Sequence, residues 1–207
     1  MDLNNYFKYI VDEIHSTVVA TVDDKGLPVT CVVNMMDYDD NGLYFLTARG
    51  KKIYDRLKKQ GYISLTGIKG RNTMSSVSIS IRGKVREIEK EYIDYLVKKN
   101  SYIEEIYPTK ESRDVLAAFK LYEGSGELFD LSQKPIERVN FTFGNMKSTI
   151  QRYFVNNKCI GCKLCYFKCP QKCIDIKMNK AIIKEKHCLQ CGNCFEICPV
   201  QAIEKRG

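Results

Sequence analysis

The cysteines constrain this chain more than any other feature. Nine of its ten cysteines lie between Cys159 and Cys198, and the first 155 residues contain only Cys31. Eight of the nine form two copies of one spacing, C-x2-C-x2-C-x3-C-P, which begin at Cys159 and, 29 residues later, at Cys188. Such a repeat predicts a small C-terminal segment that is organised around metal–thiolate bonds, because about 50 residues bury too little apolar surface on their own.

Each copy of the repeat supplies ligands to two iron–sulfur clusters, in the pattern of bacterial ferredoxins. Three cysteines at two-residue gaps surround one [4Fe–4S] cluster, and the fourth, which precedes proline, points to the other cluster. The predicted ligands of the first cluster are Cys159, Cys162, Cys165 and Cys198. Those of the second are Cys188, Cys191, Cys194 and Cys169.

Other interpretations of the cysteines fit less well. Structural zinc also uses CxxC pairs, but it has no need of a third and a fourth cysteine before proline in both copies. A disulfide scaffold belongs in an oxidising compartment, and the N-terminal residues show no secretory signal. Cys173 aligns with Ala202 of the second copy, so it is either a small buried residue beside a cluster or a spare ligand.

Charge and hydropathy narrow the range of partners. Residues 156–207 hold ten Lys+Arg and four Asp+Glu. Two clusters of about −2 each reduce this excess, which leaves a mildly basic module that suits an acidic electron-transfer protein. We find no nucleic-acid-binding motif and no apolar run of roughly 18 residues, so we expect no nucleic acid, no membrane and a cytoplasmic location.

Short β-rich runs separated by Asp/Asn-Gly turns dominate the first 150 residues, which predicts a closed barrel. We expect helices over 3–14, 51–60 and 89–99. We expect strands over 16–22, 28–36, 43–47, 62–67, 74–87 and 138–143, and a hairpin of 117–123 and 127–131 around Gly124-Ser125-Gly126. The predicted domains are a barrel over 1–147, a linker over 148–155 and a ferredoxin-type domain over 156–207.

One segment of the barrel carries the residues of an anion site. Thr47 ends a predicted strand, and Arg49, Lys51 and Lys52 precede a predicted helix. Backbone N–H groups at a helix start, together with these cations, favour a phosphate. From spacing alone, a solvated basic loop is an equal alternative.

Residues 1–145 resemble the pyridoxamine 5′-phosphate oxidase-like, FMN-binding split-barrel superfamily. Within that superfamily, the sequence pattern is most similar in style to the small nitroimidazole-reductase-like and general-stress members. The resemblance rests on the order of Thr17–Thr21, Asp24–Pro28, Gly42–Thr47 with Lys51-Lys52, Ser78–Gly83, Leu128–Leu131 and Arg138–Gly144.

The resemblance implies a homodimer that binds FMN in a groove between its subunits. The implied phosphate ligands are Thr47, Arg49, Lys51 and Lys52. The implied lining of the isoalloxazine ring is the backbone of Cys31, Val32, Val33 and Asn34, with Ser78 as a further candidate. Arg138–Phe143 would approach the flavin from the partner subunit. Residues typical of the vitamin B6 oxidase substrate site are not evident, and oxygen-sensitive clusters suit an anaerobic reaction, so we reject that oxidase activity.

The two segments together predict an iron–sulfur flavoprotein oxidoreductase with a mainly β split barrel and an α+β ferredoxin-type domain. Electrons from a ferredoxin-like donor would pass through the clusters to FMN, which would reduce a small-molecule acceptor. No catalytic residue can be named, and no GxGxxG motif supports direct use of NAD(P)H. The alternatives are an electron-transfer protein without its own substrate, and a flavin-free barrel that serves only dimerisation.

Overall fold

The computed structural model describes residues 3–147 and 152–206, and its chain forms two compact units. The first unit comprises Met1–Gly70, Ser78–Glu127 and Phe141–Met146. The second comprises Arg71–Val77, Leu128–Asn140 and Lys147–Gly207. Strands β7 and β8 therefore contribute residues to both units. Among the described helices, none is long and apolar enough to cross a membrane.

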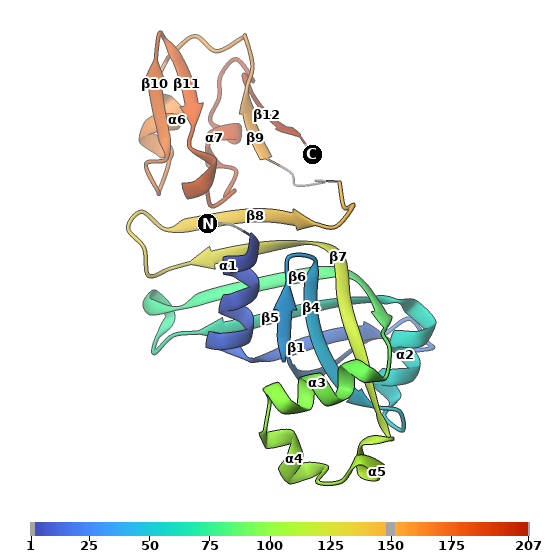
Figure 1. Ribbon diagram of the computed structural model, residues 1–207. Helices are drawn as coiled ribbons and strands as arrows, with labels where there is room; N and C mark the ends of the chain where they lie inside the picture. Colours follow the sequence, from blue (N-terminus) through green and yellow to red (C-terminus); the bar gives the residue numbers. More distant parts are fainter. Residues whose placement is uncertain (1–2, 148–151, 207) are drawn as a thin grey trace. The chain divides into compact units, whose positions relative to one another are not determined.

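An eight-stranded sheet forms the barrel, in the order β2-β1-β5-β6-β7-β4-β3, with β8 paired to β7 (Figure 1). The strands are β1 (Ser16–Val22), β2 (Pro28–Asn34), β3 (Asp37–Asp39), β4 (Gly42–Ala48), β5 (Tyr62–Lys69), β6 (Val77–Glu87), β7 (Leu116–Asp130) and β8 (Glu137–Phe143). The β1–β2, β1–β5, β3–β4 and β4–β7 pairs are antiparallel. Contacts between β2 and β4 bring the two ends of the sheet together.

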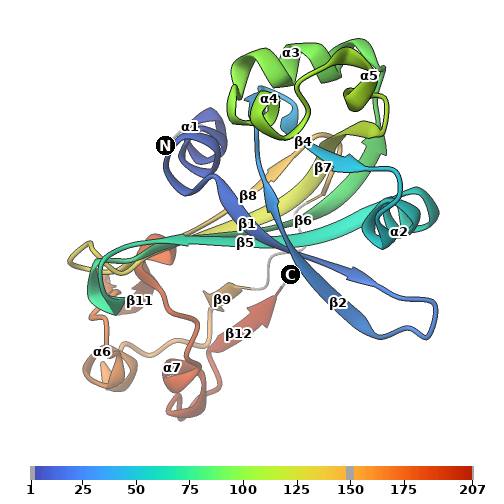
Figure 2. The ribbon, with the colours of Figure 1, turned by 90° about the horizontal axis from the view of Figure 1, so that it is seen from below.

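Several helices pack against this barrel. The first is α1 (Leu3–Lys8), which continues as the π-helical turn Tyr9–Ile14, and α2 (Lys52–Gln60) follows β4. The others are α3 (Glu91–Lys99), α4 (Tyr102–Ile106) and α5 (Lys110–Arg113), with a 3-10 turn at Thr73–Ser75. Figure 2 shows α3, α4 and α5 grouped at one end of the sheet.

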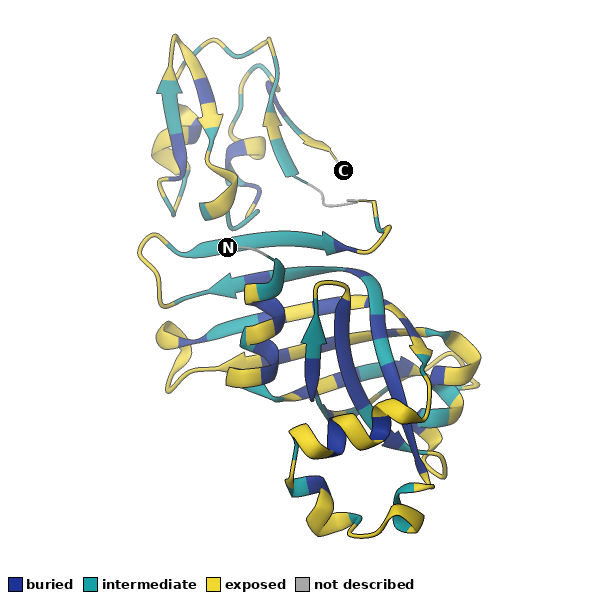
Figure 3. Ribbon diagram, in the orientation of Figure 1, coloured by how far each residue is buried: buried dark blue, intermediate teal, exposed yellow. Residues whose placement is uncertain are grey.

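Alternating side chains fill the barrel, as strand geometry requires. Phe7, Phe45 and Phe119 are fully buried, and the rings of the last two stack 5.7 Å apart. Strand β4 is buried on both faces, because the barrel lies on one side of it and the α3–α4 helices on the other (Figure 3). Ile93, Leu96 and Val97 of α3 belong to this second core.

The predicted helices and most predicted strands of this part are confirmed, but the predicted hairpin turn at residues 124–126 is wrong. Strand β7 runs through it without a break. The glycines instead allow close packing. A Cβ on Gly124 would lie 2.4 Å from the carbonyl oxygen of Arg82, and one on Gly126 would lie 2.3 Å from the Phe141 ring.

Two short antiparallel pairs and two short helices form the rest of the second unit. Strand β9 (Arg152–Val155) pairs with β12 (Ile203–Arg206), and β10 (Ile174–Lys177) pairs with β11 (Lys180–Ile183). Helices α6 (Leu164–Lys168) and α7 (Asn193–Glu196) occupy equivalent places in the two repeats, and Glu185–His187 is a 3-10 turn. Strand β9 covers residues 152–155 of the predicted linker, and residues 148–151 lie outside the described residues.

The packing of Gly124 leads to a stability test. We expect Gly124→Ala to lower the free energy of unfolding by about 1–3 kcal/mol, because the added methyl group meets a backbone carbonyl that cannot move aside. The matched control is Gly50→Ala, since no atom lies within 4 Å of its added Cβ. Urea unfolding of both variants checks this, and equal midpoints would contradict it.

Candidate cofactor sites

Two cavities in the second unit are each lined by four of the predicted cluster ligands. The first cavity contains Cys159, Cys162, Cys165 and Cys198. The second contains Cys169, Cys188, Cys191 and Cys194. In each cavity, three cysteines come from one repeat and the fourth from the other, which is the crossed arrangement that the spacing predicts.

Backbone amides at both cavities are placed to stabilise thiolates. The amide of Ala202 donates to Cys198 Sγ at 3.2 Å, and that of Gln190 donates to Cys188 Sγ at 3.4 Å. Gly161 has φ +68°, and a Cβ there would lie 2.5 Å from the carbonyl oxygen of Asn179. A side chain at this position would therefore push the 178–179 turn away from the first loop.

Cys173 lines the second cavity as a fifth thiol. It is buried, and its Sγ lies 3.5 Å from Cys169 Sγ. A hydrogen bond to Cys188, together with burial, raises the pKa of Cys173, so this thiol keeps its proton. The same hydrogen bond lowers the pKa of Cys188 to about 6. Ala202, the equivalent residue of the second repeat, lines the first cavity and offers no such donor.

The first unit has an open cleft of about 470 Å³. This volume falls within the roughly 300–1,000 Å³ that small-molecule sites occupy. Strand β2, the end of β4, the start of α2, and α4 with the residues beside it supply most of its lining. Six of the nine residues predicted to bind a flavin line it, namely Cys31, Val32, Val33, Asn34, Thr47 and Lys51.

One end of the cleft is cationic and the rest is mostly apolar. Lys51 lies at the start of α2, and Arg56 follows one turn into the helix. Arg56 Nε donates to Thr21 Oγ1 at 2.7 Å, which fixes the guanidinium beside the sheet. Sequence reasoning missed Arg56, although its spacing from Ile53 places both on one face of α2. Away from these cations, Met36, Ile103, Ile106 and Leu116 line the cleft.

The remaining predicted flavin residues do not line this cleft. Arg49 makes an ion pair with Glu87 at 2.7 Å and lies over the Tyr54 ring. Lys52 is exposed, and Ser78 lies on β6. In the predicted segment Arg138–Phe143, Arg138 Nη1 donates to the carbonyl oxygen of Leu189 at 3.1 Å. Arg138 is therefore held by the loop of the second cysteine cavity.

Polar groups in the cleft are oriented by a short hydrogen-bonded series. Ser16 Oγ donates to Asn34 Oδ1 at 2.8 Å, and Asn34 Nδ2 donates to the Tyr102 hydroxyl at 3.0 Å. Because the Tyr102 oxygen accepts this bond, its own proton remains available to a ligand. Burial raises the pKa of Cys31, which argues against a nucleophilic role for this thiol.

Two protein-family models match this chain. Residues 4–125, more than half of the chain, match the family model described as pyridoxamine 5′-phosphate oxidase. The chain belongs to the pyridoxamine 5′-phosphate oxidase family. Residues 158–202 of this family member match a second model, described as a 4Fe-4S dicluster domain. The predicted split barrel and ferredoxin-type domain are therefore confirmed.

Solved structures support the barrel fold of this family member. A NimC/NimA family protein from Clostridium acetobutylicum aligns with a TM-score of 0.58 and 13% identity over 69% of this chain and 92% of its own. A protein related to general stress protein 26, from the same organism, aligns with a TM-score of 0.52 and 16% identity over 65% and 90%. At these identities, the likeness shows the fold alone.

Two sequence relatives with iron–sulfur or oxidoreductase names match short parts of this chain. One component of an ion-translocating oxidoreductase complex from Methanosarcina acetivorans is 46% identical over 48 residues, which cover 23% of this chain and 18% of the relative. Pyruvate synthase subunit PorD from Methanothermobacter marburgensis is 39% identical over 56 residues, which cover 27% and 65%. The chain thus spans less than two thirds of the length of either relative.

Pairs of cysteine substitutions can test the crossed ligand sets. Cys159→Ala with Cys198→Ala removes two predicted ligands of one cluster, so about four irons should remain per chain. Cys188→Ala with Cys198→Ala removes one predicted ligand from each cluster, and we expect nearly complete loss of iron. Iron and sulfide analysis after anaerobic reconstitution measures both. The reverse ranking would contradict the crossed assignment.

Proposed function

We propose that this protein is an FMN-dependent, ferredoxin-linked reductase of a small-molecule acceptor. The observation that carries the proposal is the presence, in one chain, of two four-cysteine cavities and a cleft with a cationic end. Two [4Fe–4S] clusters would take electrons singly from a donor protein. Two such electrons and two protons complete the reduction of the acceptor.

The chemistry of the cleft supports FMN as its cofactor. The cationic end offers Lys51, Arg56 and the Thr47 hydroxyl, which suit a phosphate monoester. No side chain caps the start of α2, so its first backbone N–H groups are also available to an anion. FMN, when bound, supplies a two-electron centre between one-electron carriers and an organic acceptor.

Tyr102 is our candidate for the residue that contacts the acceptor. It lines the cleft on α4, and its hydroxyl accepts from Asn34, so that its proton can be donated to a ligand. The ring of His15 packs against it edge-on, with the ring centroids 5.7 Å apart, and restricts its rotation. The apolar lining around it favours an uncharged, flat acceptor over a charged one.

We also propose a homodimer, through the exposed side of the sheet formed by β1, β2 and β5. Val18 and Val32 are cross-strand neighbours and are 49% and 66% exposed, and Ile68 of β5 is 65% exposed. Such a group of apolar side chains on a sheet face favours burial against another protein. Val32 also lines the cleft, so a second copy on this face would complete its wall.

An electron-transfer protein without its own substrate is the alternative. The cleft favours the reductase, because a bare carrier has no need of an open apolar space beside its flavin. For the reductase and for the electron-transfer protein alike, the identity of the electron donor and the class of acceptor are proposals.

Anaerobic reconstitution followed by a turnover screen tests the function. We expect about eight irons and one FMN per chain. With an acidic ferredoxin kept reduced, we expect catalytic consumption of nitroaromatic or enone acceptors, measured by product analysis. Stoichiometric FMN with electron transfer but no turnover of any acceptor would favour the alternative. Absence of bound FMN after reconstitution would contradict both.

The cationic end of the cleft can be tested separately. Lys51→Ala with Arg56→Ala should weaken FMN binding at least about tenfold, because two charge-assisted contacts are lost. Lys59→Ala with Lys98→Ala removes the same charge from exposed positions and should leave binding unchanged. Fluorescence titration with FMN and iron analysis measure both effects. Equal affinity in the two double variants would contradict the assignment.

A further inference from the structure

The two cysteine loops are related by the repeat but differ sharply in surface charge. Residues 158–173 contain four lysines and no Asp or Glu, and the equivalent residues 187–202 contain one Glu and no Lys or Arg. With a cluster of about −2 in each loop, the local charge becomes about +2 and −3. Cys162 and Cys191 are both exposed, so access alone does not distinguish the loops.

Exposed apolar side chains accompany the lysines of the first loop. Ile160 is 62% exposed, Phe167 is 78% exposed, and Met178 is fully exposed on a turn that packs against Gly161. At the positions equivalent to Ile160 and Phe167, the second loop has the partly buried Leu189 and the charged Glu196. We call the first-cluster face the surface formed by Lys158, Ile160, Lys163, Leu164, Phe167, Lys168 and Met178.

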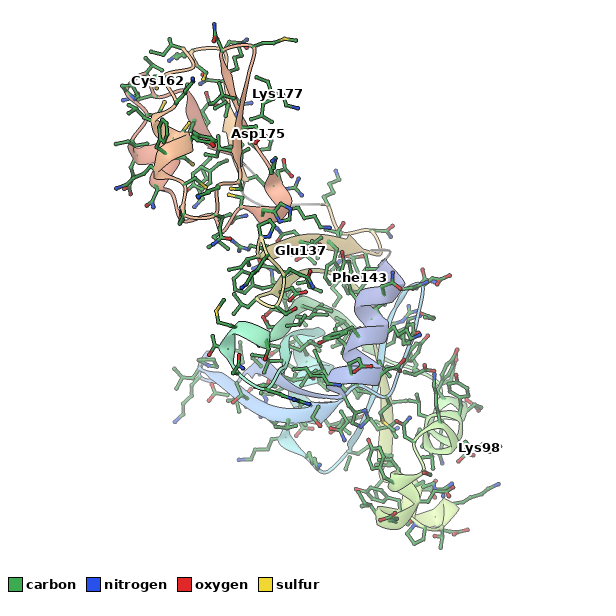
Figure 4. The ribbon with its side chains drawn as sticks, turned by 90° about the vertical axis from the view of Figure 1, so that its left-hand side faces the viewer. Lys98, Glu137, Phe143, Cys162, Asp175 and Lys177 are labelled. Atoms are coloured by element: carbon green, nitrogen blue, oxygen red, sulfur yellow. The ribbon has the colours of Figure 1, made fainter. Side chains whose placement is uncertain are left out.

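The second loop is engaged by the chain itself. Besides the bond from Arg138 to Leu189, His187 Nδ1 lies 3.1 Å from the carbonyl oxygen of Ile136, and Lys186 pairs with Glu137 at 2.6 Å. These residues all belong to the second unit. Within that unit, Cys162 and Glu137 lie toward opposite ends (Figure 4). In the part of the unit that the structure describes, residues 136–138 contact the second loop, whereas Lys163, Phe167 and Lys168 of the first loop are exposed.

We propose that the first-cluster face is the docking site of an acidic one-electron carrier protein, and that electrons enter the chain at the first cluster. The proposal rests on the proposed function, in which the clusters receive electrons from a donor. Lys158, Lys163 and Lys168 have no carboxylate partner within ion-pair distance among the described residues, so their charge remains available to an acidic surface. The central apolar side chains would be buried on contact, in the usual arrangement of a protein interface with a polar rim.

The direction of electron flow follows from the same asymmetry. An incoming acidic carrier is attracted to the net positive first loop and repelled by the net negative second loop. The second cluster then receives its electron from the first, inside one small unit, and passes it on. The second loop, with its Arg138 contact and the fifth thiol of Cys173, lies where the chain's own residues surround it.

Charge reversal on the holoprotein tests this proposal. The test variant is Lys163→Glu with Lys168→Glu, and the matched control is Lys98→Glu with Lys205→Glu, which changes the net charge equally at exposed positions of α3 and β12. The probe is an acidic plant-type [2Fe–2S] ferredoxin, whose spectrum differs from that of the clusters. Stopped-flow oxidation of the reduced probe at low salt gives the rate, and carbodiimide cross-linking gives the contact residues.

We expect the test variant to accept electrons about tenfold or more slowly than the unaltered protein, with a weaker salt dependence and loss of the cross-link to residues 158–168. The control should retain both the rate and the cross-link. Equal slowing in the two variants, or cross-links confined to other lysines, would overturn the proposal. Binding to anionic phosphatidylserine vesicles that is lost in the test variant, while the ferredoxin rate is kept, would also overturn it.

The readouts distinguish this proposal from the proposed function. Chemical reduction by dithionite should reduce the clusters equally in all variants, which shows that the clusters are intact. If the dithionite-reduced protein consumes no acceptor, the proposed function fails, but docking and reduction by the probe are still measured. If acceptors are consumed and the charge reversals have no effect on the probe, the docking site alone fails.

Discussion

The crossed connection between the two cysteine repeats is the constraint on which the second unit depends. Among the described residues, its main buried cluster consists of three cysteines together with Ile174, Ala181 and Ile203. So small an apolar core stabilises a fold only weakly. Each repeat also sends its fourth cysteine into the cavity of the other. Metal–thiolate bonds at both cavities would therefore hold the two halves together, and binding of the clusters and folding become one process.

The barrel is stabilised differently, by apolar packing rather than by metal–thiolate bonds. Its apolar core packs β4 against α3, and this frame sets the ends of β2, β4 and α2 around a cleft. The frame positions cations at one end of the cleft and apolar groups at the other. An anionic cofactor with a flat apolar body is the ligand that uses both ends.

Features that depend on residues close together in the chain could be predicted from the sequence. Ligand spacing in the cysteine loops is set within a dozen residues, and the strands after Asp/Gly turns follow from alternation and turn chemistry. Arg56, Tyr102 and the pairing of Ile136, Glu137 and Arg138 with the second loop were not predicted. Each of these depends on residues that are far apart in the chain. The glycines of β7 were misread because a glycine that permits close packing looks, in sequence, like one that permits a turn.

The sequence alone predicts eight thiols in a crossed repeat, a β-rich barrel, and cations beside Thr47. The charge difference between the two repeats is there as well. Which cations reach the cleft depends on the folded chain, because Arg49 is drawn to Glu87 across the sheet while Arg56 is held at Thr21. Folding also decides which cysteine loop residues 136–138 contact, because these contacts join segments about 50 residues apart, and such long-range pairing leaves no local signal.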